Sequence, residues 1–158
     1  MKYLISVLIS AALLTGCDLL NPPGDIIICT VKTKENQACS PVLSLKSGEL
    51  ILKGKDLSFE LTADYEACFQ SEKIKFTGQY EQRGQSHIQD IELLAQEMKI
   101  LDEGKIKDFP KTIGLISLNL KSNKGHFVDI WATTQAYGKS DDLPANAEVH
   151  CQSELTEH

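Results

Sequence analysis

Of all the residues in this 158-residue chain, the cysteines could take part in the widest range of chemistry. Cys29, Cys39, Cys68 and Cys151 contain no C-x-x-C spacing, which is the commonest signature of a zinc site. His150 stands next to Cys151, and neighbouring residues cannot easily aim both side chains at one ion. We therefore expect no metal site and no cofactor.

Other side chains that could catalyse a reaction lack a supporting pattern. The chain has no G-x-S-x-G nucleophile elbow and no glycine-rich phosphate loop. Asp64 with Glu66, or Asp141 with Asp142, could pair as acid and base, but no apolar stretch surrounds either pair to separate their pKa values. We expect the histidines at the surface rather than as general bases, and the protein not to be an enzyme. The histidines are His87, His126, His150 and His158.

Asp129 is the one carboxylate in an unusual setting. It lies between Phe127 and Trp131 on one face of a predicted strand. An acid flanked by aromatic side chains could mark the mouth of a ligand pocket or a partner surface, since interface centres are rich in aromatics. The alternative is an ordinary exposed face on which Trp131 covers a loop. These three residues are the candidate binding surface.

The first residues of the chain have the pattern of an export signal. Lys2 is followed by an uncharged, mostly apolar run from Leu4 to Leu14. The uncharged stretch ends at Cys17, and Asp18 follows, so it is too short for the roughly 20 residues that a transmembrane helix needs.

Leu14-Thr15-Gly16-Cys17 resembles the lipobox of bacterial lipoproteins. The resemblance implies a signal peptide over residues 1–16, cleavage before Cys17, and attachment of diacylglycerol to its thiol, with further acylation such as palmitate. Such chains anchor a protein to a membrane without a transmembrane helix.

Residues next to Cys17 bear on the compartment. Asp18 resembles the signal that retains lipoproteins at the periplasmic face of the inner membrane, although the outer membrane stays possible. Residues 17–24 contain Pro22-Pro23-Gly24, which blocks a helix and predicts a short lipidated tether. Residues 25–158 then form a single globular domain.

Removal of residues 1–16 leaves 158 − 16 = 142 residues, enough for one core. It also removes Lys2, so the formal net charge falls from −6 to −7. An acidic chain argues against nucleic acid as a partner, because that partner requires clustered cations.

Four cysteines remain after Cys17, and an even number in an exported domain predicts two disulfides. Three pairings are possible, and we favour Cys29–Cys39 with Cys68–Cys151. The second bridge would join the last strand to the middle of the chain.

Alternating apolar and polar residues predict seven or eight strands. They are Ile26–Val31, Pro41–Leu45, Glu49–Lys53, Leu57–Ala63, Lys73–Gln82, Ile116–Lys121, His126–Thr134 and Ala147–Gln152. Turns are expected at Ser47-Gly48 and at Ser122–Gly125, with a connector over Lys105–Thr112.

One helix is predicted over Ser86–Asp102. Ser86 and Gln89 form a capping-box pair, and Gly104 stands where the helix would end. The apolar residues at spacings of three and four are Ile88, Ile91, Leu94, Met98 and Leu101. A strand is the alternative, because Ile91 and Leu93 also fit a period of two.

The expected fold is mainly β: an antiparallel β-sandwich or small β-barrel with one packed helix. The expected function is that of a lipid-anchored, non-enzymatic interaction module for an envelope protein partner. A lipocalin-like carrier of an apolar ligand and a small envelope hydrolase are the alternatives.

Overall fold

A computed structural model describes residues 26–34, 43–85, 87–131 and 146–154. The predicted signal, Cys17, the tether and Cys39 lie outside these residues. Within them the chain forms eight strands and no regular helix beyond a short turn at Ile130 and Trp131. The strands are β1 (Ile26–Thr33), β2 (Ser44–Lys53), β3 (Ser58–Ala67), β4 (Gln70–Gln85), β5 (Ile88–Ile100), β6 (Lys105–Asn119), β7 (Lys124–Asp129) and β8 (Asn146–Glu154).

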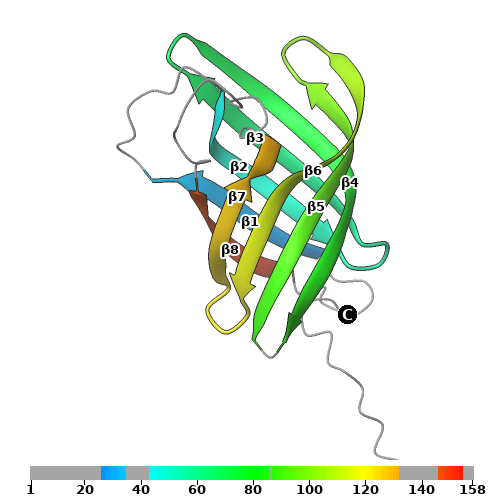
Figure 1. Cartoon of the computed structure of the whole chain (residues 1–158), viewed down its shortest axis with the longest axis vertical. Coiled ribbons are helices and arrows are strands. Elements are labelled where there is room, and N and C mark those ends of the chain that lie inside the picture. Colours follow the sequence, from blue (N-terminus) through cyan, green and yellow to red (C-terminus); the bar gives the residue numbers. More distant parts are fainter. Residues whose placement is uncertain (1–25, 35–42, 86, 132–145, 155–158) are drawn as a thin grey trace, which may run out of the picture.

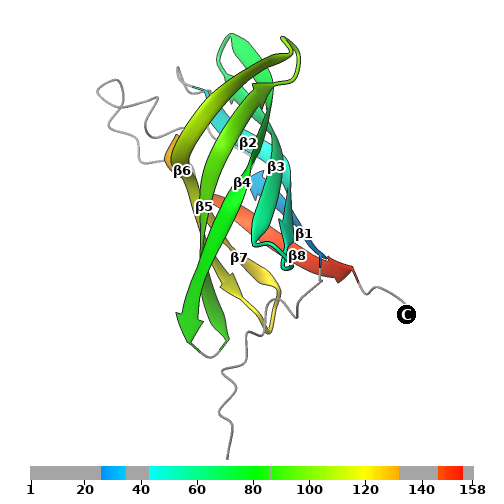
Figure 2. The ribbon, with the colours of Figure 1, turned by 90° about the vertical axis from the view of Figure 1, so that its right-hand side faces the viewer.

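The strands form a closed barrel in which each strand pairs antiparallel with the next. β1 and β8 also pair, so the first and last strands close the sheet. The long β4–β5 hairpin reaches furthest toward the bottom of Figure 1, and the side view shows β8 and β1 crossing behind it at a steep angle (Figure 2). The mainly β, antiparallel prediction is confirmed, and of its two forms the barrel is the observed one.

The barrel interior is built from the period-two pattern of the strands. In β3 the residues from Phe59 to Tyr65 alternate between buried and half-buried, which points every second side chain inward. The inward side chains of all eight strands form one apolar cluster, and Phe59, Leu61, Phe76, Leu93 and Phe127 are among those with 1% exposure or less. An eight-stranded barrel is just narrow enough for side chains to fill it.

The predicted helix over Ser86–Asp102 is wrong, because its described part is strand β5. Ile91, Leu93 and Ala95 point inward with a period of two. An irregularity in the pairing between Ala95 and Glu97 then shifts the alternation, so Met98 is also buried. This bulge produces a spacing of three between Ala95 and Met98 that imitates a helical face.

Two segments that were predicted to interrupt the strands are themselves part of strands. The turn expected at Ser47-Gly48 is a pairing irregularity between Leu45 and Ser47 inside the continuous β2. The connector expected over Lys105–Thr112 belongs to β6. In both places turn-forming or proline residues occur within a long strand next to a bulge, where such residues are tolerated.

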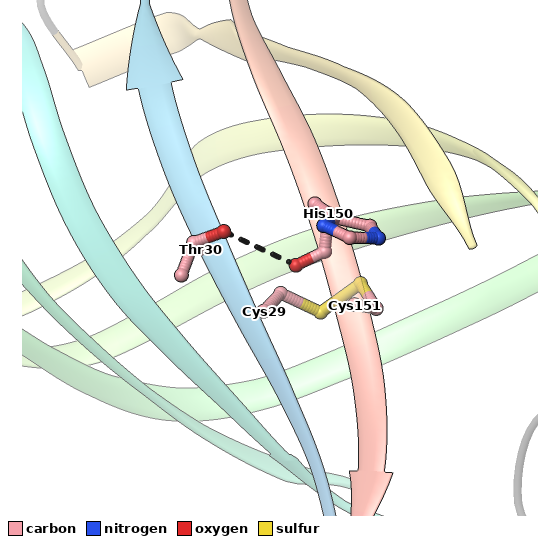
Figure 3. The surroundings of a disulfide bond; sticks show 4 residues. All are labelled: Cys29, Thr30, His150 and Cys151. Carbon is pink, nitrogen blue, oxygen red and sulfur yellow. Dashed lines mark hydrogen bonds between the residues drawn. A yellow bond between two sulfur atoms is a disulfide. The ribbon is translucent and has the colours of Figure 1, made fainter.

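The favoured disulfide pairing is wrong as well. Cys29 is bonded to Cys151, which faces it directly in the pairing of β1 with β8. Figure 3 shows this bridge across the two strands, beside the hydrogen bond from the Thr30 hydroxyl to the His150 carbonyl. The prediction failed because the sequence does not show that β1 pairs with β8. That pairing exists only because the sheet closes into a barrel. Cys68 is also disulfide-bonded.

Candidate functional site

Phe127 and Asp129 of the candidate binding surface lie on one face of β7, and that face is the barrel interior. The strand predicted over His126–Thr134 ends at Asp129, so Trp131 lies in the short helical turn that follows and not on the strand. Phe127 and Asp129 are fully buried, and Trp131 is 6% exposed. A partner on the outside of the barrel therefore has no access to them. Within the described part of the chain, Asp129 is the one buried charged side chain.

Tyr65 of β3 is the partner that holds the Asp129 carboxylate inside. Its phenol donates a side-chain hydrogen bond to Asp129, and it is itself 1% exposed. Burial raises the pKa of Tyr65 well above its ordinary value, and the charge of Asp129 and the hydrogen bond raise it further. The phenol is therefore a permanent donor, which is what a buried carboxylate requires.

An aromatic cluster surrounds this pair at the end of the barrel where β3 and β7 finish. The Trp131 ring lies 4.8 Å from the Tyr65 ring and 5.7 Å from the Phe76 ring, in edge-to-face contacts. Phe109 extends the cluster, 6.1 Å from Phe76. Such contacts add to stability beyond the area that they bury. The cluster and the Tyr65–Asp129 pair are thus a packed interior rather than an open pocket.

A groove of about 700 Å³ lies on the outer face of the barrel, across the wall from this interior. We call it the outer groove. Its lining comes from the beginning of β5, the hairpin of β6 with β7, and the neighbouring β8 and β1. The lining residues are Thr30, Lys32, Ile88, Ser117, Asn119, Lys124, Gly125, His126, Glu148, Val149 and His150.

Strand register arranges the polar residues of the outer groove in two rows, each crossing four strands. The first row is Ser117, His126, Glu148 and Lys32. The second row is Asn119, Lys124, His150 and Thr30. Neighbouring strands are about 4.8 Å apart, so each row spans about 14 Å. The rows therefore form a continuous polar surface over four neighbouring strands.

The outer groove contains charges of both signs. Lys32 and Lys124 contribute two cations, and Glu148, which pairs with Lys34 at 3.5 Å, contributes one anion. On the opposite wall, Glu60 of β3 likewise lies between two lysines, Lys53 of β2 and Lys75 of β4. Exposed Asp90 and Glu49 lie beside Ser117 and Thr30 at the two edges of the outer groove, so the groove is polar and of mixed charge.

Sequence reasoning identified the members of this site only as separate surface residues. His126 and His150 are exposed, as predicted, but the prediction did not bring them together. His87 lies in the β4–β5 turn and not in a helix. Asp64 and Glu66 lie on β3 and pair with Lys73 and Lys46, respectively. Asp141 and Asp142 fall outside the described residues.

The described residues contain neither a cluster that could bind a metal nor a helix that could span a membrane. No group of three or more His, Cys, Asp or Glu side chains there is placed to hold a metal ion. No helix in that part of the chain has the length and apolar character needed to cross a bilayer.

Comparison of the chain with protein-family models, with curated proteins and with solved structures finds no match in any of the three.

Proposed function

We propose that the mature chain is a lipid-anchored, non-enzymatic interaction module of the bacterial cell envelope, and that it binds its partner through the outer groove. The observation that carries this proposal is the two-row polar surface of Lys, His, Ser, Thr and Asn side chains on the outer wall. A rigid sheet holds these side chains in fixed register, which lowers the entropic cost of binding a partner.

The lipobox supports anchoring at Cys17, at the periplasmic face of the inner membrane as Asp18 suggests or otherwise at the outer membrane. β1 begins at Ile26, which is 26 − 17 = 9 positions after Cys17. Nine extended residues reach at most roughly 30 Å. The barrel end where β1 begins therefore lies near the bilayer, together with the β4–β5 and β6–β7 turns, which lie at that same end and border the outer groove.

The two other candidate functions have less support. A lipocalin-like carrier needs interior space, whereas the inward side chains here form a closely packed cluster with Trp131 and Phe127 inside it. For a hydrolase, Asp129 cannot serve as the acid or base, because it is fully buried and bonded to Tyr65.

Site-specific photocrosslinking in intact cells tests the proposal. A photoreactive residue at Ser117, in the outer groove, should give a discrete adduct with one envelope component. The same residue at Lys73, exposed on β4 on the opposite wall, should not. Equal adducts from both positions, or none from either, would exclude the outer groove as the binding face.

A further inference from the structure

The lower end of β4 is an open strand edge. β4 pairs with β3 only as far as Gln79, which faces Ser58, whereas its pairing with β5 continues to Gln85. In the described part of the chain, the last bond on the β3 side runs from the Tyr80 N–H to the Leu57 carbonyl, at 2.8 Å. Leu57 has a left-handed φ of 52°, so the chain enters β3 from a turn and does not extend beside the end of β4. Figure 1 accordingly shows the lower end of β4 beside β5 and without a second neighbouring strand.

The backbone groups on this open edge belong to Gln82 and Gly84. In an antiparallel strand, alternate residues direct their N–H and C=O groups to opposite neighbours. The Tyr80 N–H points toward β3, and the pairing of β4 with β5 is regular from Gly78 to Gln85, so Gln82 and Gly84 point the same way as Tyr80. No described strand pairs with them there. Such an edge is a template for one more strand, and an extended polypeptide segment is therefore what it fits.

The side chains along the open edge are self-complementary about Gln82. Glu81 and Arg83 are 68% and 78% exposed, and they form an ion pair at 2.9 Å on the outer face. Gln82 lies between them on the other face, and its Oε1 atom is buried without a hydrogen-bond partner among the described residues.

One register of two copies satisfies all of these groups together. When two β4 edges pair antiparallel with Gln82 facing Gln82, Glu81 of each copy faces Arg83 of the other. Opposite charges that face each other across an antiparallel pair are favourable. The two Gln82 side chains then lie next to each other on one face, where each Oε1 can accept from the NH₂ group of the other.

From this complementarity we infer that the occupant of the open edge is a second copy of this chain, paired antiparallel around a two-fold axis at Gln82. Such an interface is isologous, since the same residues serve both copies. It consists of two backbone hydrogen bonds, two ion pairs and one amide pair, so the dimer is weak in free solution and favoured by a high local concentration. The inference goes beyond the proposed function, because no residue of β4 lines the outer groove.

Charge reversal tests the inference on the mature chain, residues 17–158, carrying Cys17→Ser. Sedimentation equilibrium up to millimolar concentration should show a monomer–dimer equilibrium. Arg83→Glu places like charges opposite each other twice and should weaken association at least about tenfold. The double variant Glu81→Arg/Arg83→Glu restores opposite charges and should recover it. Lys73→Glu, the same reversal where β3 already covers β4, is the control and should leave association unchanged.

Cross-linking tests the register. Residues that face each other in this kind of pair have Cα atoms about 5.5 Å apart, within the range of a disulfide. Mild oxidation of concentrated Gln82→Cys protein should therefore give a dimer joined through position 82. Gln79→Cys, exposed on the same strand but flanked by β3 and β5, should not.

Circular dichroism verifies that each variant retains the barrel. Recovery in the double variant together with cross-linking at position 82 alone supports the two-fold pairing. A monomer at every concentration, an association that Arg83→Glu leaves unchanged, a loss that the double variant does not recover, or equal cross-linking at positions 79 and 82 overturns it.

Discussion

The carboxylate of Asp129 is buried among aromatic rings. The free energy of unfolding of the protein therefore depends on the hydrogen-bond donors that this carboxylate finds there. Tyr65→Phe removes one donor and should lower the free energy of unfolding by about 1–3 kcal/mol, because a buried carboxylate then loses a hydrogen bond. Asp129→Asn should cost less, since an amide oxygen still accepts from the phenol. Urea unfolding of the two variants measures both losses.

The double variant Tyr65→Phe/Asp129→Asn is the matched control. If the pair interacts as inferred, its loss should be smaller than the sum of the single losses by more than about 0.5 kcal/mol. Additive losses would mean that the phenol does not stabilise Asp129.

Glu60 is the residue whose titration should affect stability at low pH. The side-chain hydrogen bond from Lys53, at 2.5 Å, and then that from Lys75 lower the pKa of Glu60 from 4.5 to about 2. A lowered folded-state pKa stabilises the barrel fully above pH 4.5, and this contribution disappears as the pH falls toward 2. Its size should be about 1 kcal/mol, because the side chain is 29% exposed.

Glu60→Gln should therefore reduce stability at pH 7 and flatten its decline between pH 4.5 and 2, measured by urea unfolding at stepped pH. Glu97→Gln, an exposed acid of β5, is the control and should leave the slope unchanged. A Glu60→Gln profile parallel to that of the wild type would contradict the ion-pair interpretation.

At the scale of elements, the seam between β1 and β8 depends on a covalent link. The Cys29–Cys151 bond closes a loop with a sequence separation of 122 residues. In the chain-entropy model, a loop of this length stabilises the fold by about 5 kcal/mol. Cys29→Ala/Cys151→Ala should lower the free energy of unfolding by about 3–5 kcal/mol under oxidising conditions.

Comparing the wild type with Cys29→Ala/Cys151→Ala under reducing conditions separates the effect of the disulfide from that of the changed side chains. The wild type then loses the Cys29–Cys151 bond, and any disulfide of Cys68 is lost equally in both proteins. The difference in urea midpoint should shrink to the small contribution of packing. A difference that persists unchanged on reduction would show that the cross-link is not its source.

The strands that the sequence predicted well are those with unbroken alternation. The hairpin of Ile116–Lys121 with the segment after His126 was expected and is observed as the β6–β7 pair. β5 was mistaken for a helix because the bulge after Ala95 changes the alternation, and a bulge leaves no residue-type signature. β2 was divided at Ser47-Gly48 for the same reason.

The outer groove could not be predicted, because its rows join residues distant in the chain. Thr30 and His150 are 120 residues apart in sequence, yet they are adjacent across the seam. Their contact depends on barrel closure, which is a property of topology rather than of any local pattern. The interior position of Asp129 was similarly hidden, since alternation shows which residues share a face but not which face is inside.

At the scale of the whole molecule, the five cysteines bear on both the fold and the proposed lipid anchor. Cys29 and Cys151 are bonded to each other, and Cys68 is also disulfide-bonded. The remaining cysteines are Cys17 and Cys39. If the thiol of Cys17 is acylated, it cannot form a disulfide, and we then expect Cys68 to pair with Cys39.

Peptide mapping of the membrane-extracted protein without reduction should therefore give two products together: a disulfide-linked peptide pair containing Cys39 and Cys68, and an N-terminal peptide with a diacylglycerol mass on Cys17. Cys17→Ser should abolish the lipid mass and release the protein from the membrane, while the Cys39–Cys68 peptide pair persists. A Cys17–Cys68 peptide pair in the wild type would exclude lipidation. Because both products come from one digest, the lipid anchor and the second disulfide are tested by the same measurement.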